Sequence, residues 1–79
     1  MENYLTNDET SVTGRELVKK LKAKRLVTEM TQKTLSEKTG ISVYKLSLIE
    51  NGERSLTIDE AAMIGQALGV VVKWYLEVE

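Results

Sequence analysis

The sequence predicts an all-α fold of four to five short helices, and three observations support this prediction. Two segments, residues 13–16 and 57–60, have the form of a capping box, in which a threonine and a glutamate satisfy free amides at a helix start. Glycines follow short periodic apolar segments at Gly40, Gly52 and Gly69, where a helix can end in left-handed geometry. The chain also contains no proline, which would interrupt a helix.

The first helix is expected over about residues 14–26. Residues 1–12 are polar with scattered apolar side chains, and we interpret them as a flexible N-terminal arm before a domain that spans residues 13–79. Thr13 and Glu16 form the expected capping box. One apolar face of the helix then follows, at Leu17, Val18 and Leu21.

Two short helices and a tight turn are expected within residues 31–52, TQKTLSEKTGISVYKLSLIENG. Thr31 and Ser42 are good N-caps because their side-chain oxygens can accept from free amides in the first turn. The two helices are expected over residues 32–38 and about 43–50. Helices joined by such a turn meet at a steep angle, so the first helix braces the second and leaves its outer face free.

The second of these helices has an inward side at Leu46 and Ile49. Because successive residues of a helix are offset by roughly 100°, a different set of side chains points outward. This outward set comprises Tyr44, Ser47, Leu48 and Asn51, with Val43 and Lys45 on the flanks. An α-helix presented in this way fits the major groove of B-form DNA.

A fourth helix is expected to begin after the capping box at residues 57–60 and to end at Gly69. Its apolar stripe comprises Ala61, Ile64, Gly65 and Leu68. Residues 70–79 fit two interpretations, because their apolar side chains match both the period of a half-buried strand and one face of a short helix. A strand would need a partner, either the N-terminal arm or a second copy of the chain.

Charge is segregated along the chain, although the net charge is only −1. Residues 14–54 carry ten basic and five acidic side chains, a net charge of +5, whereas the segments on either side each carry −3. A basic middle suits a polyanionic partner better than the total charge implies. The alternative is a solvated helix surface, particularly for residues 19–25, whose charges point all round a helix.

The composition argues against several other classes of protein. The chain has neither cysteine nor histidine, so it lacks thiolates, the commonest general base and the commonest metal ligand. We therefore expect no enzymatic activity, no metal and no cofactor. No apolar run approaches the roughly 20 residues of a membrane span, and the acidic amino terminus is unlike a secretory signal. The expected location is the cytoplasm, with the nucleoid as the place of action.

A family resemblance is carried by residues 30–55, MTQKTLSEKTGISVYKLSLIENGERS, and by residues 56–70, LTIDEAAMIGQALGV. Together these segments resemble the helix-turn-helix domain of the phage repressor and Cro family, the lambda-repressor-like or XRE class of DNA-binding regulators. The resemblance extends over roughly residues 14–76. It implies a compact domain of four to five helices with the motif at residues 31–52.

The resemblance also implies a set of DNA-contacting residues. In that family, the glutamine that opens the first motif helix contacts the DNA backbone and braces the reading residues, and Gln32 stands at this position. The residues that begin the second motif helix reach bases and phosphates, and the asparagine after it binds phosphate. The implied DNA-binding set is Thr31, Gln32, Lys33, Ser42, Val43, Tyr44, Lys45, Ser47, Leu48, Asn51 and Arg54.

Among several departures from the family pattern, two fall on expected base-reading positions. Val43 and Leu48 stand where relatives often have arginine, lysine or glutamine, and neither can make two-point hydrogen bonds to a base. They can contact a thymine methyl group, or they can serve a protein interface.

The sequence therefore supports two functional hypotheses. The first is a sequence-specific DNA-binding transcriptional regulator from a bacterium, phage or mobile element. It is repressor-like in the sense of its family and binds double-stranded DNA as a homodimer. The expected dimer contacts are Val72, Trp74 and Leu76. The alternative is a protein-binding module on the same fold, such as an antirepressor, antitoxin or phage inhibitor.

Overall fold

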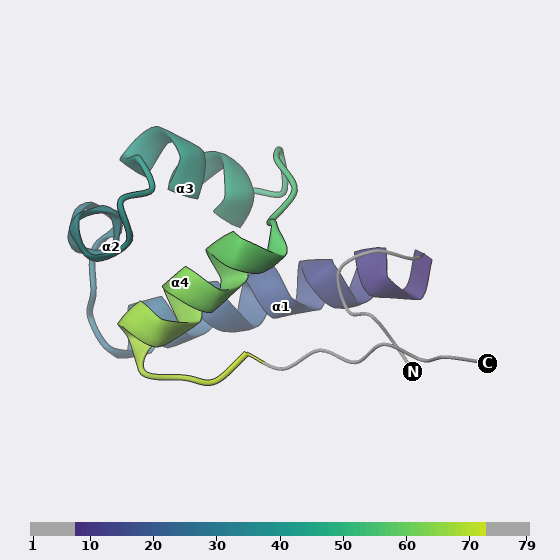
Figure 1. Ribbon diagram of the computed structural model, residues 1–79, viewed down its shortest axis with the longest axis horizontal. Coiled ribbons are helices and arrows are strands. Elements are labelled where there is room, and N and C mark those ends of the chain that lie inside the picture. The colour runs from purple at the N-terminus through teal and green to yellow at the C-terminus, as the bar shows by residue number, and fades with distance from the viewer. Residues whose placement is uncertain (1–7, 73–79) are drawn as a thin grey trace.

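The computed structural model describes residues 8–72, with side chains described from residue 15 onward. Four helices make up this part of the chain, and residues 8–72 contain no strand, which confirms the all-α prediction (Figure 1). The helices are α1 (Asp8–Val27), α2 (Gln32–Thr39), α3 (Val43–Glu50) and α4 (Ile58–Leu68). The predicted arm falls largely on residues 1–7, which lie outside the described residues, as do Trp74 and Leu76.

The four helices pack around a single apolar core. α2 packs against α3 and α4, while α1 packs against α3 and α4, so α3 is held from two sides (Figure 1). Leu35 and Leu46 are the largest fully buried side chains, each with 1% of its surface exposed, and burial of a leucine side chain contributes about 1.5–3 kcal/mol. The buried apolar residues are Leu21, Leu35, Ile41, Leu46, Ile49, Leu56, Ala61, Ile64 and Leu68.

α1 differs from the prediction at its start. The helix begins at Asp8, so residues 8–12 belong to a helix rather than to an arm, and Thr13 lies within the helix instead of at its N-cap. The prediction of a start near residue 14 was wrong because a sequence with the capping-box pattern can also lie inside a helix that begins closer to the N-terminus.

α1 ends in a left-handed residue that is not glycine. Glu29 has a φ of 59°, the one positive φ outside glycine among the described residues. The amide of Glu29 donates to the carbonyl of Leu26, and the amide of Met30 donates to the carbonyl of Arg25, both at 3.0 Å. This pair of hydrogen bonds is the Schellman arrangement, in which the left-handed position is usually occupied by glycine.

The other helix ends follow the predicted signals closely. The hydroxyls of Thr31 and Ser42 accept hydrogen bonds from main-chain amides in the first turns of α2 and α3. Thr57 and Glu60 form a complete capping box at the start of α4. Gly40, Gly52 and Gly69 all have left-handed geometry beyond the ends of α2, α3 and α4.

The chain beyond α4 turns back along the helical body, as the yellow segment in Figure 1 shows. Residues 70–72 are neither helix nor strand, and they are the only part of the ambiguous segment 70–79 that the structure describes. Val70 and Val72 pack against the core, whereas Val71 is 81% exposed. A Cβ placed on Gly65 would lie 2.6 Å from Val72 Cγ2. Val72 can therefore pack against α4 at this point only because residue 65 is a glycine. Val72, a predicted dimer contact, therefore packs within its own chain.

Candidate nucleic-acid interface

The turn between α2 and α3 is fixed by a threonine as well as by glycine. Thr39 Oγ1 donates to the carbonyl of Leu35 at 2.8 Å and accepts from the amide of Ile41 at 3.1 Å. Gly40 has a φ of 78°, and its amide donates to the carbonyl of Ser36 at 2.8 Å. Because Ile41 is also buried, the turn is tied to the core, and α2 holds α3 at a set angle.

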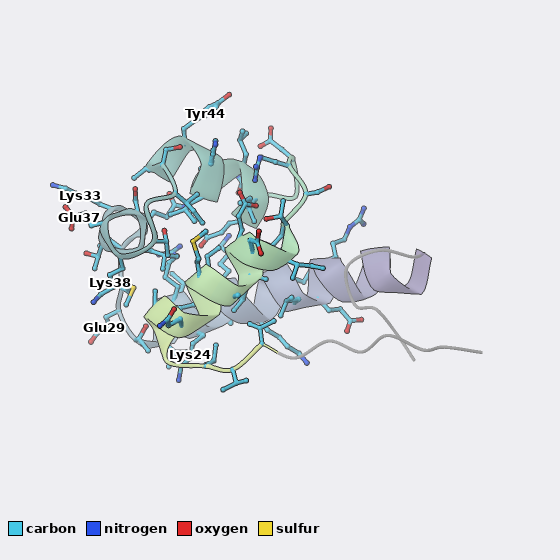
Figure 2. All side chains as sticks on the ribbon, viewed as in Figure 1. Lys24, Glu29, Lys33, Glu37, Lys38 and Tyr44 are labelled. Atoms are coloured by element: carbon cyan, nitrogen blue, oxygen red, sulfur yellow. The ribbon has the colours of Figure 1, made fainter. Side chains whose placement is uncertain are left out.

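The N-terminal half of α3 presents its outer face to solvent. Leu46 and Ile49 are buried, as predicted for the inward side. Tyr44 is 73% exposed and Val43 is 41% exposed, and Lys45 beside them is also exposed. Tyr44 projects away from the other helices in Figure 2. The start of α3 is therefore a free surface with one positive charge and one aromatic ring.

The second half of α3 is less open than predicted. Ser47 and Leu48, which were both predicted to point outward, are half-buried rather than exposed. The carbonyl of Leu48 accepts hydrogen bonds from the amides of Glu53 and Arg54, which fold the loop after α3 back against the helix. Asn51 is exposed, and its Nδ2 lies 3.5 Å from Ser47 Oγ, a long separation for a hydrogen bond.

Gln32 belongs to a polar network that joins three helices. Arg25 of α1 donates from Nε to Glu50 Oε2 at 2.8 Å and from Nη2 to Glu50 Oε1 at 2.9 Å. Its Nη1 donates to the carbonyl of Met30 at 2.8 Å. Gln32 Nε2 donates to Glu50 Oε1 at 2.9 Å. The start of α2 is thereby tied to the end of α3 through a carboxylate that α1 holds in place.

The charges of this network are largely withdrawn from water. Arg25 is only 8% exposed. Burial raises the pKa of the Glu50 carboxyl, but hydrogen bonds from Arg25 and Gln32, together with the charge of Arg25, outweigh burial and leave the pKa lowered. Glu50 is therefore ionised at neutral pH, and paired charges of this kind are costly to break because the remaining partner stays buried.

Arg25 and Glu50 were not recognised from the sequence, although a signal was present. Arg25 lies four residues after Leu21, on the apolar face of α1, and Glu50 lies four residues after Leu46, on the inward face of α3. A charged residue that falls on an apolar stripe needs a partner of opposite charge. Two such residues of opposite sign indicate a buried pair.

Arg54, a predicted phosphate contact, is already paired. Its Nη1 and Nη2 donate to the two carboxylate oxygens of Glu60, each at 3.0 Å. Glu60 also accepts from the amide of Thr57 as part of the capping box. The Arg54 side chain beside Glu60 lowers the pKa of that carboxyl, despite an opposing contribution from burial. The positive charge of Arg54 is thus offset within the domain.

The remaining predicted contacts lie at the starts of α2 and α3. Thr31 and Ser42 use their hydroxyls as N-caps, at 3.0 Å from the amide of Thr34 and 3.1 Å from the amide of Lys45. Lys33 is exposed and extends from α2 into solvent (Figure 2). The structure therefore combines a braced glutamine, two capped helix starts and exposed lysines within one motif.

Two further findings concern the described part of the chain. Residues 8–72 contain no helix that is long and apolar enough to cross a membrane. Within the same residues, no three acidic side chains are grouped in a way that could hold a metal ion.

Comparison with known proteins gives one match. A family model described as helix-turn-helix matches residues 21–74, which is more than half of the chain. Neither the curated proteins nor the solved structures gave a match. The matched region includes all of α2, the turn, α3 and α4. The chain therefore belongs to the helix-turn-helix family of the Cro and C1 type, a family of DNA-binding regulators.

Proposed function

We propose that this chain is a sequence-specific transcriptional regulator that acts in the cytoplasm by placing α3 in the major groove of an operator. The observation that carries this proposal is the free N-terminal face of α3, where Val43, Tyr44 and Lys45 are exposed while Leu46 and Ile49 anchor the opposite side. A helix held by one face and open on the other meets the geometric need of major-groove binding.

Phosphate contacts would flank this helix. Lys33 and Lys45 supply exposed positive charge, and Asn51 offers an exposed amide just beyond α3. The capped starts of α2 and α3 present main-chain amides, which favour anionic groups. These groups give affinity and register but carry no direct sequence information.

Sequence would be read mainly through shape and apolar contact. Val43 has no hydrogen-bonding side-chain atoms, so it fits a thymine methyl group rather than the edge of guanine or adenine. Tyr44 offers an exposed ring and a hydroxyl that can donate and accept. We expect a preferred site with thymine opposite Val43.

Pairing of two copies would supply the affinity that one small domain lacks, and a roughly twofold operator would follow. Because Val72 packs against its own core, we propose that the exposed Val71 takes its place in the dimer contact, next to Trp74 and Leu76. A repressor-like action would result from occupation of the operator.

Selection of preferred sites from a random pool of duplex DNA tests the proposal, followed by titration of the enriched duplex at several salt concentrations. We expect an inverted repeat and steep salt dependence. Each of Lys33→Ala and Lys45→Ala should reduce the slope of log K against log salt by about 0.9. Lys24→Ala is the matched control, because Lys24 lies on the opposite side of the molecule from Tyr44 in Figure 2.

A second candidate function is a protein-binding module, and the composition of α3 favours it. Apart from Lys45, the helix contains none of the long polar residues, arginine, lysine, asparagine and glutamine, that make two-point contacts with guanine or adenine. Val43 and Tyr44 instead form an exposed apolar pair. If no duplex is enriched and mixed-sequence DNA does not bind at low salt, this second function replaces the first.

A further inference from the structure

Glu50 determines which of the two polar atoms of the Gln32 carboxamide, nitrogen or oxygen, faces the carboxylate. An ionised carboxylate only accepts hydrogen bonds, so the amide nitrogen of Gln32, and not its carbonyl oxygen, must face Glu50. Nε2 occupies that place, 2.9 Å from Glu50 Oε1. The nitrogen carries a second hydrogen, which no side chain or main-chain group among residues 15–72 accepts.

We propose that Glu50, clamped by Arg25, is a positioning residue for DNA binding, which orients Gln32 so that the second hydrogen on Nε2 is donated to a DNA phosphate. The inference rests on the proposed function. One amide nitrogen would then bridge two acceptors, the carboxylate inside the protein and the phosphate outside it. Gln32 opens α2 and is half-buried, so its amide sits between the core network and the surface.

The orientation of the amide matters because a phosphate, like a carboxylate, only accepts hydrogen bonds. If the Gln32 amide were flipped, its carbonyl oxygen would take the place of Nε2 and would repel both anions. Without Glu50, the two orientations would be close in energy, and DNA would have to select one of them. The conformational entropy that the Gln32 side chain loses on binding would then lower the affinity for DNA.

Arg25 makes an anionic positioning residue compatible with a DNA surface. An unpaired Glu50 would repel a nearby phosphate, but the two hydrogen bonds from Arg25 offset its charge. Arg25 also holds the carboxylate plane through both oxygens, so the oxygen that receives Gln32 has a fixed place. The sequence separation of 25 between Arg25 and Glu50 means that the fold itself sets this orientation.

A purely structural role for Glu50 makes a different prediction. In that case, loss of the carboxylate would loosen the contact between α1 and α3 and would weaken DNA binding whether or not Gln32 is present. If Glu50 acts through Gln32, its loss should weaken binding only when Gln32 is present. A double-mutant cycle separates these cases.

The cycle compares the wild-type chain with Gln32→Ala, Glu50→Gln and the double variant on the selected duplex, after circular dichroism has shown that each is folded. Each single variant should lower affinity by at least roughly tenfold, the effect of one hydrogen bond to a charged group. The double variant should bind no more weakly than either single variant. Losses that multiply in the double variant would overturn the positioning role.

The orientation is also measurable without DNA, by the two side-chain amide proton resonances of Gln32 in a nitrogen-15 spectrum. One proton should be shifted downfield and protected from exchange in the wild-type chain, and the shift should disappear in Glu50→Gln. Two protons at the ordinary shifts of a solvent-exposed glutamine amide in the wild-type chain would overturn the inference while leaving the proposed function intact. Failure of the wild-type chain to bind any duplex would overturn both.

A second pair of variants keeps the test informative if Glu50→Gln does not fold. Gln32→Lys retains donors to both anions and should bind at least as well as the wild-type chain. Gln32→Met has a similar length without donors and should bind like Gln32→Ala. Equal affinity of these two variants would overturn the donor role of Gln32.

Discussion

At the scale of single residues, the placement of charge decides what the motif can do. Glu50 and Glu60 are each held by an arginine from elsewhere in the chain, so both carboxylates stabilise the fold only while they are ionised. The positive charges of Arg25 and Arg54 are therefore already paired within the protein and are less available to a DNA phosphate. The exposed lysines of α2 and α3 therefore carry most of the available positive charge of the motif.

The stability of the domain should depend on pH in the acidic range. The pKa values of Glu50 and Glu60 are lowered in the folded chain, so the folded state binds fewer protons than the unfolded state at acidic pH. The free energy of unfolding should stay level near neutrality and fall as the pH drops below about 4.3, the ordinary value for glutamate. Urea titrations across this range measure it.

Glu50→Gln provides the control for this prediction. Its free energy of unfolding should be lower than that of the wild-type chain near neutrality, and the acid-induced fall should be smaller because one linked group is gone. Equal falls in the two chains would show that Glu50 contributes nothing to the pH dependence.

At the scale of helices and turns, the end of α1 is the least favourable local feature. Glu29 adopts a left-handed conformation that costs a residue with a Cβ about 1–2 kcal/mol relative to glycine. The Schellman hydrogen bonds and the burial of Arg25 hold it there. The turn that contains Glu29 places the carbonyl of Met30 where Arg25 Nη1 donates to it, and this hydrogen bond helps to offset the strain.

Glu29→Gly should therefore stabilise the domain. The gain expected is about 0.5–1 kcal/mol, since the relief of the left-handed strain is partly offset by the greater freedom of glycine in the unfolded chain. Chemical unfolding followed by circular dichroism measures this. Glu29→Ala keeps the strain and removes the same side chain, so a similar gain in that variant would contradict a conformational cause.

Local signals at the helix starts explain which helices could be predicted from the sequence. α2, α3 and α4 begin at Thr31, Ser42 and Thr57, whose capping hydroxyls act within one turn of the chain. Such signals are local, so the sequence contains them directly. The start of α1 was missed because the pattern at Thr13 is equally compatible with a continuing helix.

The site was predictable in part for a related reason. The outward direction of Tyr44 follows from helical period alone, and the structure confirms it. The half-burial of Leu48 and the pairing of Arg54 depend on how the loop after α3 folds back, which no local pattern specifies. The partner of Gln32 was likewise hidden, because Glu50 lies 18 residues away along the chain.

At the scale of the whole molecule, the charge available to a partner differs from the charge counted along the sequence. Residues 14–54 have a net charge of +5, but Arg54 is paired with Glu60, which lies outside that segment. The field near the end of α3 is therefore weaker than the count implies. Glu60 competes with any phosphate for the guanidinium of Arg54.

Glu60→Gln should increase affinity for DNA by roughly threefold at low salt, because it releases the charge of Arg54 from an ion pair of surface strength. Glutamine at this position still completes the capping box, so α4 keeps its start. The slope of log K against log salt should become steeper by up to about 0.9. Fluorescence anisotropy at several salt concentrations measures both quantities.

Asp59→Asn is the matched control for Glu60→Gln. Asp59 is an exposed acidic residue in the same first turn of α4, so its neutralisation changes the net charge equally. A similar gain in affinity from this variant would assign the effect to net charge rather than to the release of Arg54.

The central claim is that the free face of α3 contacts DNA, and a nitrogen-15 spectrum recorded during titration with the selected duplex tests it most directly. We predict that the largest shift changes fall on the amides of Val43, Tyr44 and Lys45, with smaller changes at the start of α2. The far side of α1, including Lys24, should remain unshifted. Changes concentrated on α1, with the amides of α3 unaffected, would contradict the claim.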